Sequence, residues 1–254
     1  MLNRNTHDTI LELNMARPPV NALNMELIKA LHQQIDLAMA DGFDAIIISG
    51  QPEIFSAGLD VPKLLGFNRQ QMVEFWIEFM SLLKCIALSP IPIVAAITGH
   101  SPAGGAVIAL PCDYRIMAHG IEKGPYKIGL NEVQVGLVVP PVIYQSLVRL
   151  TGERQAAQLV VEGLLIDSEK ALACGMVDEL QDTKDVIEGA LKWCHRHLSL
   201  PRQAMLKTRA MARKSLMESY SGADYFNVED FVEHWFHDST QTVLQMLVER
   251  LGKH

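Results

Sequence analysis

The chain has 254 residues, of which 49% are hydrophobic and 20% are charged, and its formal net charge is −7. This length and composition predict a folded, soluble protein, built either as one large domain or as a core with a small appendage. The negative charge disfavours nucleic-acid binding, which requires a basic surface, but it leaves room for an anionic ligand held by a local patch or a helix N-terminus.

The cysteine usage and the apolar stretches indicate where the protein resides. The four cysteines are scattered and form no C-x-x-C pair, which is typical of reduced thiols. Residues 1–9 are polar and lack the pattern of a secretory signal. The stretch 91–110 comes nearest to a membrane span, but Pro92, His100, Pro102 and several glycines interrupt it. We therefore expect a cytoplasmic protein that does not bind a membrane.

The first two-thirds of the chain alternate strand and helix signals. Asn24 is the predicted N-cap of the first helix, because a side-chain oxygen there can accept a hydrogen bond from the first helical turn. Alternating strands and helices favour a largely parallel α/β core with right-handed crossovers. The predicted strands cover 9–13, 43–49, 92–98 and 114–118, and helices are predicted after Asn24, over 70–88 and over 106–110.

After residue 141 the pattern becomes helical. The aromatic residues near the C-terminus fit either the core of this chain or an interface with another subunit. We expect a core domain, 1–198, and a helical lid or trimerisation region, 199–254. The predicted helices cover 142–150, 153–161, 168–174, 186–198, 201–216 and 223–250, with a break near 237–239, and 176–180 is predicted to be one further short strand.

Two turns of small residues each follow a predicted buried strand, the first at 55–60 and the second at 101–105. Glycine lets a ligand approach the main chain closely, and a helix N-terminus offers unpaired N–H groups. Such donors suit a developing oxyanion, for which one donor is worth roughly 3 kcal/mol in a dry site. Taken alone, the second turn is better explained as a tight strand-to-helix packing turn, and it does not match the P-loop pattern.

A single acid, Glu132, follows these turns in the segment Gly129-Leu130-Asn131-Glu132. Moving a proton within a molecule needs one carboxylate, whereas the addition of water usually recruits two. The two turns can direct backbone N–H groups at an oxyanion, and the single carboxylate can move a proton. Together they predict proton transfer at a carbon beside a carbonyl.

Other polar motifs carry weaker signals. The segment 194–197, Cys-His-Arg-His, lies near a predicted helix C-terminus and has no second ligand pair, so we expect no metal site. His100 and Ser101 are adjacent but lack the G-x-S-x-G elbow of a serine hydrolase. We expect Asp60 and Asp113 to anchor a turn and a strand end rather than to catalyse.

Five segments occur in the order found in the crotonase (enoyl-CoA hydratase/isomerase) superfamily, which essentially the whole chain resembles. The residues of these motifs are most similar to those of mitochondrial-type Δ3,Δ2-enoyl-CoA isomerases. The resemblance implies an α/β fold with the crotonase ββα spiral core and a helical C-terminal region, an acyl-CoA substrate without a further cofactor, and assembly into homotrimers or hexamers. The five segments are 18–24, 55–60, 102–105, 112–115 and 129–132.

The resemblance also implies roles for individual residues. The backbone N–H groups of Leu59 and Gly104 would form an oxyanion hole for the thioester oxygen, and Glu132 matches the catalytic acid/base of the family. Asn131 would line the acyl pocket. The first turn would lie against the coenzyme A portion, and its residues in this role are Ser56, Ala57, Gly58, Leu59 and Asp60.

Two positions depart from the hydratase pattern. Hydratases carry a further glutamate three residues after the oxyanion glycine, where this chain has Val107, which cannot accept a proton. Many hydratases also carry a lysine at the position of Pro62, so a role of Lys63 in binding coenzyme A stays open. The same holds for Phe236 and Arg250, which are candidates only through their position near the C-terminus.

These features predict a Δ3,Δ2-enoyl-CoA isomerase of fatty-acid β-oxidation, in which Glu132 moves a proton from C2 to C4. An apolar pocket should raise the pKa of this carboxyl above its reference value of ~4.3. The alternatives are a 2-enoyl-CoA hydratase, another acyl-CoA enzyme of the superfamily, and a non-catalytic acyl-CoA-binding protein. The acyl chain length stays open, as does the choice between trimer and hexamer.

Overall fold

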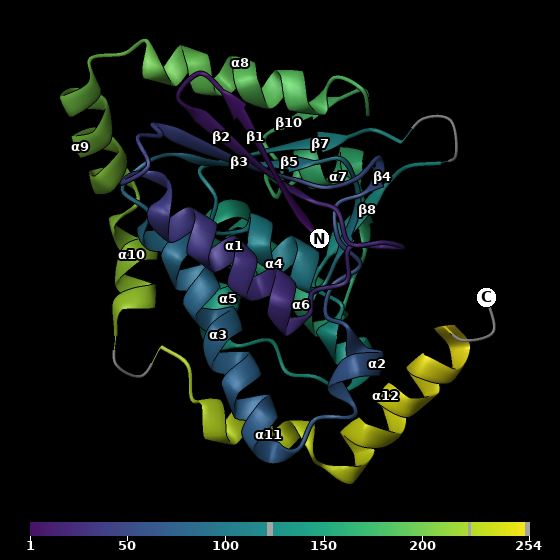
Figure 1. Ribbon diagram of the computed structural model, residues 1–254. Coiled ribbons are helices and arrows are strands. Elements are labelled where there is room, and N and C mark those ends of the chain that lie inside the picture. Colours follow the sequence, from purple (N-terminus) through teal and green to yellow (C-terminus); the bar gives the residue numbers. More distant parts are fainter. Residues whose placement is uncertain (121–123, 223–224, 252–254) are drawn as a thin grey trace.

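The computed structural model describes residues 1–120, 124–222 and 225–251 (Figure 1). Within these residues, six strands form one sheet in the order β1-β2-β3-β5-β7-β10, and four short strands form a second in the order β4-β6-β8-β9. The first sheet consists of Leu2–His7 (β1), Ile10–Met15 (β2), Ala45–Ser49 (β3), Ile93–Ile97 (β5), Tyr114–Ala118 (β7) and Glu179–Gln181 (β10). The second consists of Glu53–Ile54 (β4), Gly99–Pro102 (β6), Lys127–Gly129 (β8) and Ile166–Asp167 (β9).

The centre of the first sheet is buried on both faces, as its continuous apolar runs predict. All five residues of β3 and all five of β5 are buried. The strands from β2 to β10 pair in parallel, which requires the chain to cross over between them. Among the described strands of this first sheet, only β1 is antiparallel to its neighbour, and this edge strand exposes four of its six residues.

The chain passes from the first sheet to the second three times. β3 is followed by β4, β5 by β6 and β7 by β8. The order β3-β5-β7 in the first sheet is therefore repeated as β4-β6-β8 in the second. A helical segment follows each pair of strands, which gives the ββα spiral that the sequence predicts. These segments are α2 (Val61–Leu64) and α3 (Arg69–Leu88), then α4 (Gly104–Ala109), then the 3₁₀ turn η1 (Glu132–Val135) and α5 (Pro141–Thr151).

Helices cover both faces of the first sheet. α1 (Met25–Ala38) packs on α3 on one face, and α8 (Val186–Leu198) lies across β3, β5 and β7 on the other (Figure 1). Asn24 accepts a hydrogen bond from Leu27 N at 3.0 Å, which confirms the predicted N-cap of α1. Two further helices, α6 (Glu153–Val161) and α7 (Ser168–Ala173), follow α5.

The C-terminal helices return along α3 toward the second sheet (Figure 1). α10 (Lys214–Ser221) and α11 (Val228–Trp235) both pack on α3, while α9 (Arg202–Ala212) precedes them and α12 (Asp238–Leu251) ends the described chain. The Trp76 ring of α3 lies 6.3 Å from that of Phe226 and 4.5 Å from that of Phe231. These C-terminal aromatics therefore pack in the core of this chain. The division at residue 198 stays a prediction.

Several elements differ from those expected from the sequence. β1 was not expected, because an exposed edge strand shows no apolar alternation. The helix predicted over 201–216 is broken at Arg213, whose buried guanidinium donates to the carbonyl oxygens of Ala87 and Pro111. The helix predicted from residue 223 begins only at Val228, as α11, and residues 223 and 224 lie outside the described residues. The predicted break near 237–239 is confirmed, because α11 ends at Trp235 and α12 begins at Asp238. The strand predicted over 176–180 begins only at Glu179.

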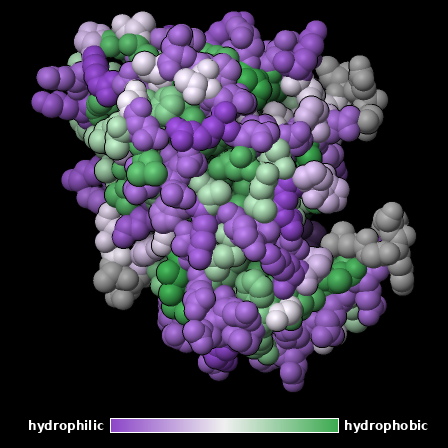
Figure 2. All heavy atoms as spheres, in the orientation of Figure 1, coloured by the Kyte–Doolittle hydropathy of each residue, from purple (hydrophilic) through white to green (hydrophobic). Residues whose placement is uncertain are grey.

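The surface is mainly polar. Figure 2 shows hydrophilic residues over most of the visible face, with apolar side chains in small groups between them. Among the described helices, none is long and apolar enough to cross a membrane.

Candidate active site

Three neighbouring strands of the second sheet run parallel and lead into the three predicted site segments. β4 precedes the turn at 55–60, β6 precedes Ala103 and Gly104, and β8 precedes Asn131 and Glu132. The carboxyl ends of parallel strands lie at one edge of a sheet, where α/β proteins commonly bind ligands. The predicted site residues are therefore brought to the same edge, although more than 70 positions separate the first from the last.

The two turns of small residues touch each other. A Cβ built on Gly58 would lie 3.3 Å from the N atom of Gly104, and a Cβ on Gly104 would lie 3.3 Å from the Cα of Gly58. Gly58 also has a φ of +89°, which side chains other than hydrogen rarely allow. Glycine at both positions therefore lets the two main chains approach closely.

The backbone N–H of Leu59 is left free by the way its neighbours bond. Leu23 N donates to Gly58 O at 2.7 Å, and Asp60 N donates to Leu23 O at 3.0 Å, so the residues on either side of Leu59 bond to Leu23. In this parallel bridge the N–H of the middle residue points away from the partner. Within the described residues, no acceptor is found for the Leu59 N–H.

The N–H of Gly104 is free because Gly104 is the first residue of α4, and the first N–H groups of a helix have no acceptor inside it. No other part of the described chain accepts from it. The preceding residue, Ala103, has a φ of 45°, and its own N–H donates to Gly129 O at 2.8 Å. That bond ties the turn to the strand that leads to Glu132.

A buried asparagine holds the first turn in place. Asn21 is 1% exposed, and its side chain donates to Phe55 O at 3.1 Å and accepts from Arg17 N at 2.8 Å. Ser56 Oγ donates to Asn21 O at 2.8 Å and accepts from Gly58 N at 3.1 Å. Asn21 belongs to one of the sequence motifs, but only the fold shows that its side chain braces the turn.

Asp60 and Lys63 are both engaged in ion pairs. Asp60 pairs with Arg17 at 2.5 Å and caps α2 by accepting from Lys63 N at 3.3 Å, as expected of a turn anchor. Lys63 Nζ lies 2.8 Å from the carboxylate of Glu26, and both side chains are exposed. Opening such an exposed pair costs little, about 1 kcal/mol or less. A contact of Asp60 with coenzyme A stays a prediction, and a contact of Lys63 stays open.

Glu132 begins η1 and carries an unpaired carboxyl oxygen. Its Oε2 is buried and has no hydrogen-bond partner in the described structure. Burial raises the pKa of this carboxyl to about 7, although a bond from its own backbone N–H acts in the opposite direction. Near neutral pH such a group can both take and return a proton. The Oδ1 of Asn131, the preceding residue, is likewise buried without a partner.

The other positions discussed for the site are less informative. Val107, in α4, is 3% exposed, so the place of the hydratase acid holds a buried apolar side chain. The Phe236 ring lies 5.7 Å from the guanidinium of Arg69, and Arg250 is exposed in the last turn of α12. Whether Phe236 and Arg250 contact coenzyme A stays open.

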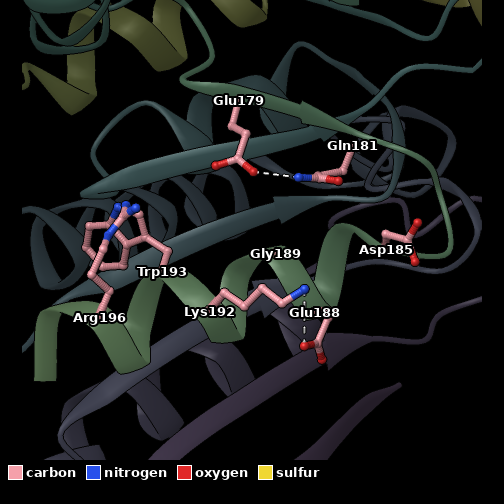
Figure 3. A pocket seen from close by; sticks show the side chains of 8 residues that line it. All are labelled: Glu179, Gln181, Asp185, Glu188, Gly189, Lys192, Trp193 and Arg196. Atoms are coloured by element: carbon pink, nitrogen blue, oxygen red, sulfur yellow. Dashed lines mark hydrogen bonds and ion pairs between the residues drawn. The ribbon is translucent and has the colours of Figure 1, made fainter. Parts of the chain in front are cut away.

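A separate hollow of about 450 Å³ lies between β10 and α8 (Figure 3). Four of its polar side chains form two pairs: Gln181 Nε2 donates to Glu179 at 2.6 Å, and Lys192 lies 3.5 Å from Glu188. None of the predicted site residues lines it. The edge of the second sheet is therefore the better candidate for the active site.

In the segment 194–197, the His197 and Cys194 side chains pack against other parts of the chain. The His197 ring stacks on Trp193 with the ring centroids 3.7 Å apart, and its Nδ1 bonds to Trp193 O at 2.9 Å. Cys194 is buried. No group of three or more His, Cys, Asp or Glu side chains that could hold a metal ion occurs in the part of the chain that the structure describes.

Comparisons with known proteins identify the family. The enoyl-CoA hydratase/isomerase family model matches residues 5–254. Human mitochondrial enoyl-CoA delta isomerase 1 is 34% identical over 94% of this chain and 79% of its own length, and a probable enoyl-CoA hydratase, echA17, of Mycobacterium avium is 34% identical over 78% of this chain and 76% of its own. The crystal structure of human mitochondrial Δ3,Δ2-enoyl-CoA isomerase, 32% identical, matches with a TM-score of 0.92 and covers 99% of this chain and 98% of that chain. The chain therefore has the crotonase fold and belongs to the enoyl-CoA hydratase/isomerase family, as its motifs predict.

Proposed function

We propose that the protein is a Δ3,Δ2-enoyl-CoA isomerase, which converts a 3-enoyl-CoA to the trans-2-enoyl-CoA in fatty-acid β-oxidation. The observation that carries the proposal is the buried, unpaired Oε2 of the Glu132 carboxyl, at the same sheet edge as the free N–H groups of Leu59 and Gly104. The similarity to enzymes named as isomerases supports this choice of substrate. No cofactor beyond the acyl-CoA substrate is needed.

In the proposed reaction, the thioester oxygen accepts hydrogen bonds from the N–H groups of Leu59 and Gly104. Removal of the C2 proton moves negative charge onto this oxygen and creates a dienolate. Both hydrogen bonds strengthen as this charge develops, so they stabilise the transition state more than the bound substrate.

Glu132 performs both proton transfers. Its carboxylate takes the C2 proton, and the electron pair of that C–H bond joins the extended enolate. The carboxylic acid then returns the proton to C4, and the double bond settles between C2 and C3. One carboxyl group is sufficient because the proton stays within the molecule. The buried Val107 supplies no second carboxylate at the position where hydratases carry one.

Replacement of Glu132 by glutamine tests this function, because it removes the base and keeps the volume of the side chain. We expect the turnover of 3-hexenoyl-CoA by Glu132→Gln to fall about 10²–10⁴-fold, the usual contribution of a general acid–base group. The matched control is Glu153→Gln, at an exposed position in the first turn of α6, which should leave turnover unchanged. Retention of most of the activity in Glu132→Gln would remove the basis of the proposal.

A 2-enoyl-CoA hydratase is the second candidate, because relatives of similar identity include probable hydratases. Crotonyl-CoA and 3-hexenoyl-CoA distinguish the two activities when they are assayed in parallel. Fast hydration of the first without isomerisation of the second would replace the isomerase by a hydratase. Tight acyl-CoA binding without turnover of any enoyl or dienoyl substrate would indicate a binding protein.

Location and assembly complete the proposal. We propose a cytoplasmic protein that forms a homotrimer or hexamer and binds neither nucleic acid nor a membrane. The isomerases named above are mitochondrial proteins, so cell fractionation is the direct check of location. Light scattering of the purified chain measures the number of subunits.

A further inference from the structure

Helix α12 contacts the segment that carries the proposed acid and the helix that follows the first turn of the proposed oxyanion hole. It packs on η1, which begins at Glu132, and on α2, which follows Leu59 and Asp60 (Figure 1). Thr240 and Leu244 lie one turn apart on this helix and are 2% and 0% exposed. The C-terminal helix is therefore placed to control the geometry of the acid without being part of the segments that carry the chemistry.

Within the described residues, one hydrogen bond joins α12 to the residue that ends η1. Thr240 Oγ1 donates to the carbonyl oxygen of Gly136 at 3.1 Å. Gly136 ends η1 with a φ of 76°, and a Cβ built on it would lie 3.4 Å from the Cα of Thr240, so the helix rests directly on this residue. Because Thr240 is buried, water cannot readily replace its hydroxyl as a donor.

The backbone of Gly136 in turn holds Glu132. The N–H groups of Gly136 and Leu137 both bond to the Glu132 carbonyl oxygen, the second at 3.0 Å. The Glu132 carboxyl, by contrast, has an unpartnered buried oxygen in the described structure, so no neighbouring side chain fixes that oxygen in place. Its position therefore depends on the backbone of η1.

We propose that Thr240 is a positioning residue: its hydroxyl, acting through Gly136, holds η1 in the arrangement that keeps the Glu132 carboxyl buried and directed into the site. The expected effect on turnover rests on the proposed function, whereas the effect on the carboxyl itself does not. In this proposal, the C-terminal helix α12 supports the active site of the same chain.

Two substitutions at Thr240 separate the hydroxyl from the shape of the side chain. Thr240→Val keeps the shape and removes the hydroxyl, and we expect it to lower kcat for 3-hexenoyl-CoA about 10-fold with little change in KM. Thr240→Ser keeps the hydroxyl and should retain most of the wild-type kcat. The matched control is Thr242→Val, because the exposed Thr242 hydroxyl bonds only to Asp238 O within α12, at 2.8 Å.

A second readout does not depend on turnover. NMR titration of the protein labelled with ¹³C in its glutamate carboxyl groups gives the pKa of Glu132, whose signal is the one absent from Glu132→Gln. A loosened η1 admits water to the carboxyl, and hydration lowers its pKa from about 7 toward 4.5, the value of an unperturbed glutamate. We expect this decrease in Thr240→Val and not in Thr242→Val.

The outcomes distinguish this inference from the proposed function. An unchanged kcat and an unchanged Glu132 pKa in Thr240→Val would overturn the role of Thr240, and so would equal changes in Thr240→Val and Thr242→Val. A lower melting temperature with normal kcat per folded molecule would also overturn it, since that result shows a structural role alone. If the wild type does not isomerise 3-hexenoyl-CoA but the pKa still falls in Thr240→Val, the positioning role stands and the proposed function fails.

Discussion

Two buried glutamates show how partners decide the basicity of a carboxyl group. Burial of Glu12 raises its pKa, but hydrogen bonds from His7, Ser49 and Asn5 outweigh that effect, and the net pKa is lowered. Glu132 lacks such partners, and burial takes its pKa to about 7. The absence of side-chain donors to the Glu132 carboxyl among the described residues is therefore what fits it to accept a proton from carbon near neutral pH.

The pH dependence of turnover follows from this pKa. Glu132 must be ionised to remove the C2 proton, so we expect kcat for 3-hexenoyl-CoA to rise with pH through an apparent pKa of about 7. Steady-state rates measured from about pH 5 to about pH 9 provide the check. An acid limb centred near 4.5, the value of an unperturbed glutamate, would show that the carboxyl is hydrated during the reaction.

The same carboxyl should lower the stability of the fold at high pH. Its pKa is about 7 in the folded chain and near 4.5 when exposed, so the folded state holds the proton more tightly. The free energy of unfolding therefore falls as pH rises between these values, by at most about 3 kcal/mol. Glu132→Gln should be more stable than the wild type by about 1–3 kcal/mol near pH 8, and the gain should vanish near pH 4. Urea unfolding at both pH values measures the difference, and an equal gain at each would contradict it.

At the scale of elements, the contact between the two turns can be tested through Gly58. Gly58 and Gly42 have φ angles of +89° and +90°, so alanine strains the backbone similarly at both, by about 1–2 kcal/mol. Only at Gly58 would the added Cβ meet the Gly104 N, at 3.3 Å, whereas nothing lies within 4 Å at Gly42.

We therefore expect both variants to lower the free energy of unfolding, Gly58→Ala by more because its Cβ also meets the second turn at 3.3 Å, while Gly58→Ala alone lowers kcat/KM, by about 10-fold or more. Thermal unfolding and initial-rate assays of the two variants make the comparison. Equal activity in both variants would show that the approach of the two turns does not matter for catalysis.

Long elements with one apolar stripe could be predicted from the sequence, but the second sheet could not. α8 and β7 have the predicted bounds, and α3 starts one residue earlier than predicted. The strands of the second sheet have two to four residues each, which is too short for any periodicity. A Cβ on Gly99 of β6 would lie 1.9 Å from the backbone of Glu53, so the pairing of these strands depends on glycine rather than on an apolar pattern.

The sequence motifs predicted the candidate site residues but not how the whole molecule arranges them. Leu59, Gly104 and Glu132 were predicted from segments that resemble a known family, and the fold brings them to one sheet edge. The support from Asn21 and Thr240 was not predicted. The Asn21 side chain donates to the carbonyl oxygen of Phe55, and the Thr240 hydroxyl donates to that of Gly136. Neither the residue type nor the sequence spacing reveals such a partner more than 30 positions away.

The C-terminal helices are joined to the core by buried charges. Asp113, which is 8% exposed, accepts from Arg209 Nε at 2.7 Å, lies 3.2 Å from Arg213 Nη1, and accepts from Ile93 N at 2.8 Å. One carboxylate therefore anchors α9, the residue between α9 and α10, and the start of β5. This confirms Asp113 as a strand-end anchor and shows that α9 and Arg213 are tied to the core through the interior.

Loss of this carboxylate should destabilise the whole chain. Asp113→Asn leaves two arginines without their shared counter-charge, and breaking a buried pair costs roughly 3 kcal/mol or more. The matched control is Asp44→Asn, which removes the partner of Arg202 from a pair whose arginine is 54% exposed, and should cost less than about 1 kcal/mol.

Calorimetry of both variants gives the melting temperature, which should fall by about 10 °C in Asp113→Asn and by about 2 °C or less in Asp44→Asn. We also expect a single transition in the wild type, because the charges that bind 199–254 lie inside the core. Two separate transitions would mean that the predicted region 199–254 unfolds on its own, and a small effect of Asp113→Asn would mean that apolar packing on α3, rather than the buried charges, holds the C-terminal helices in place.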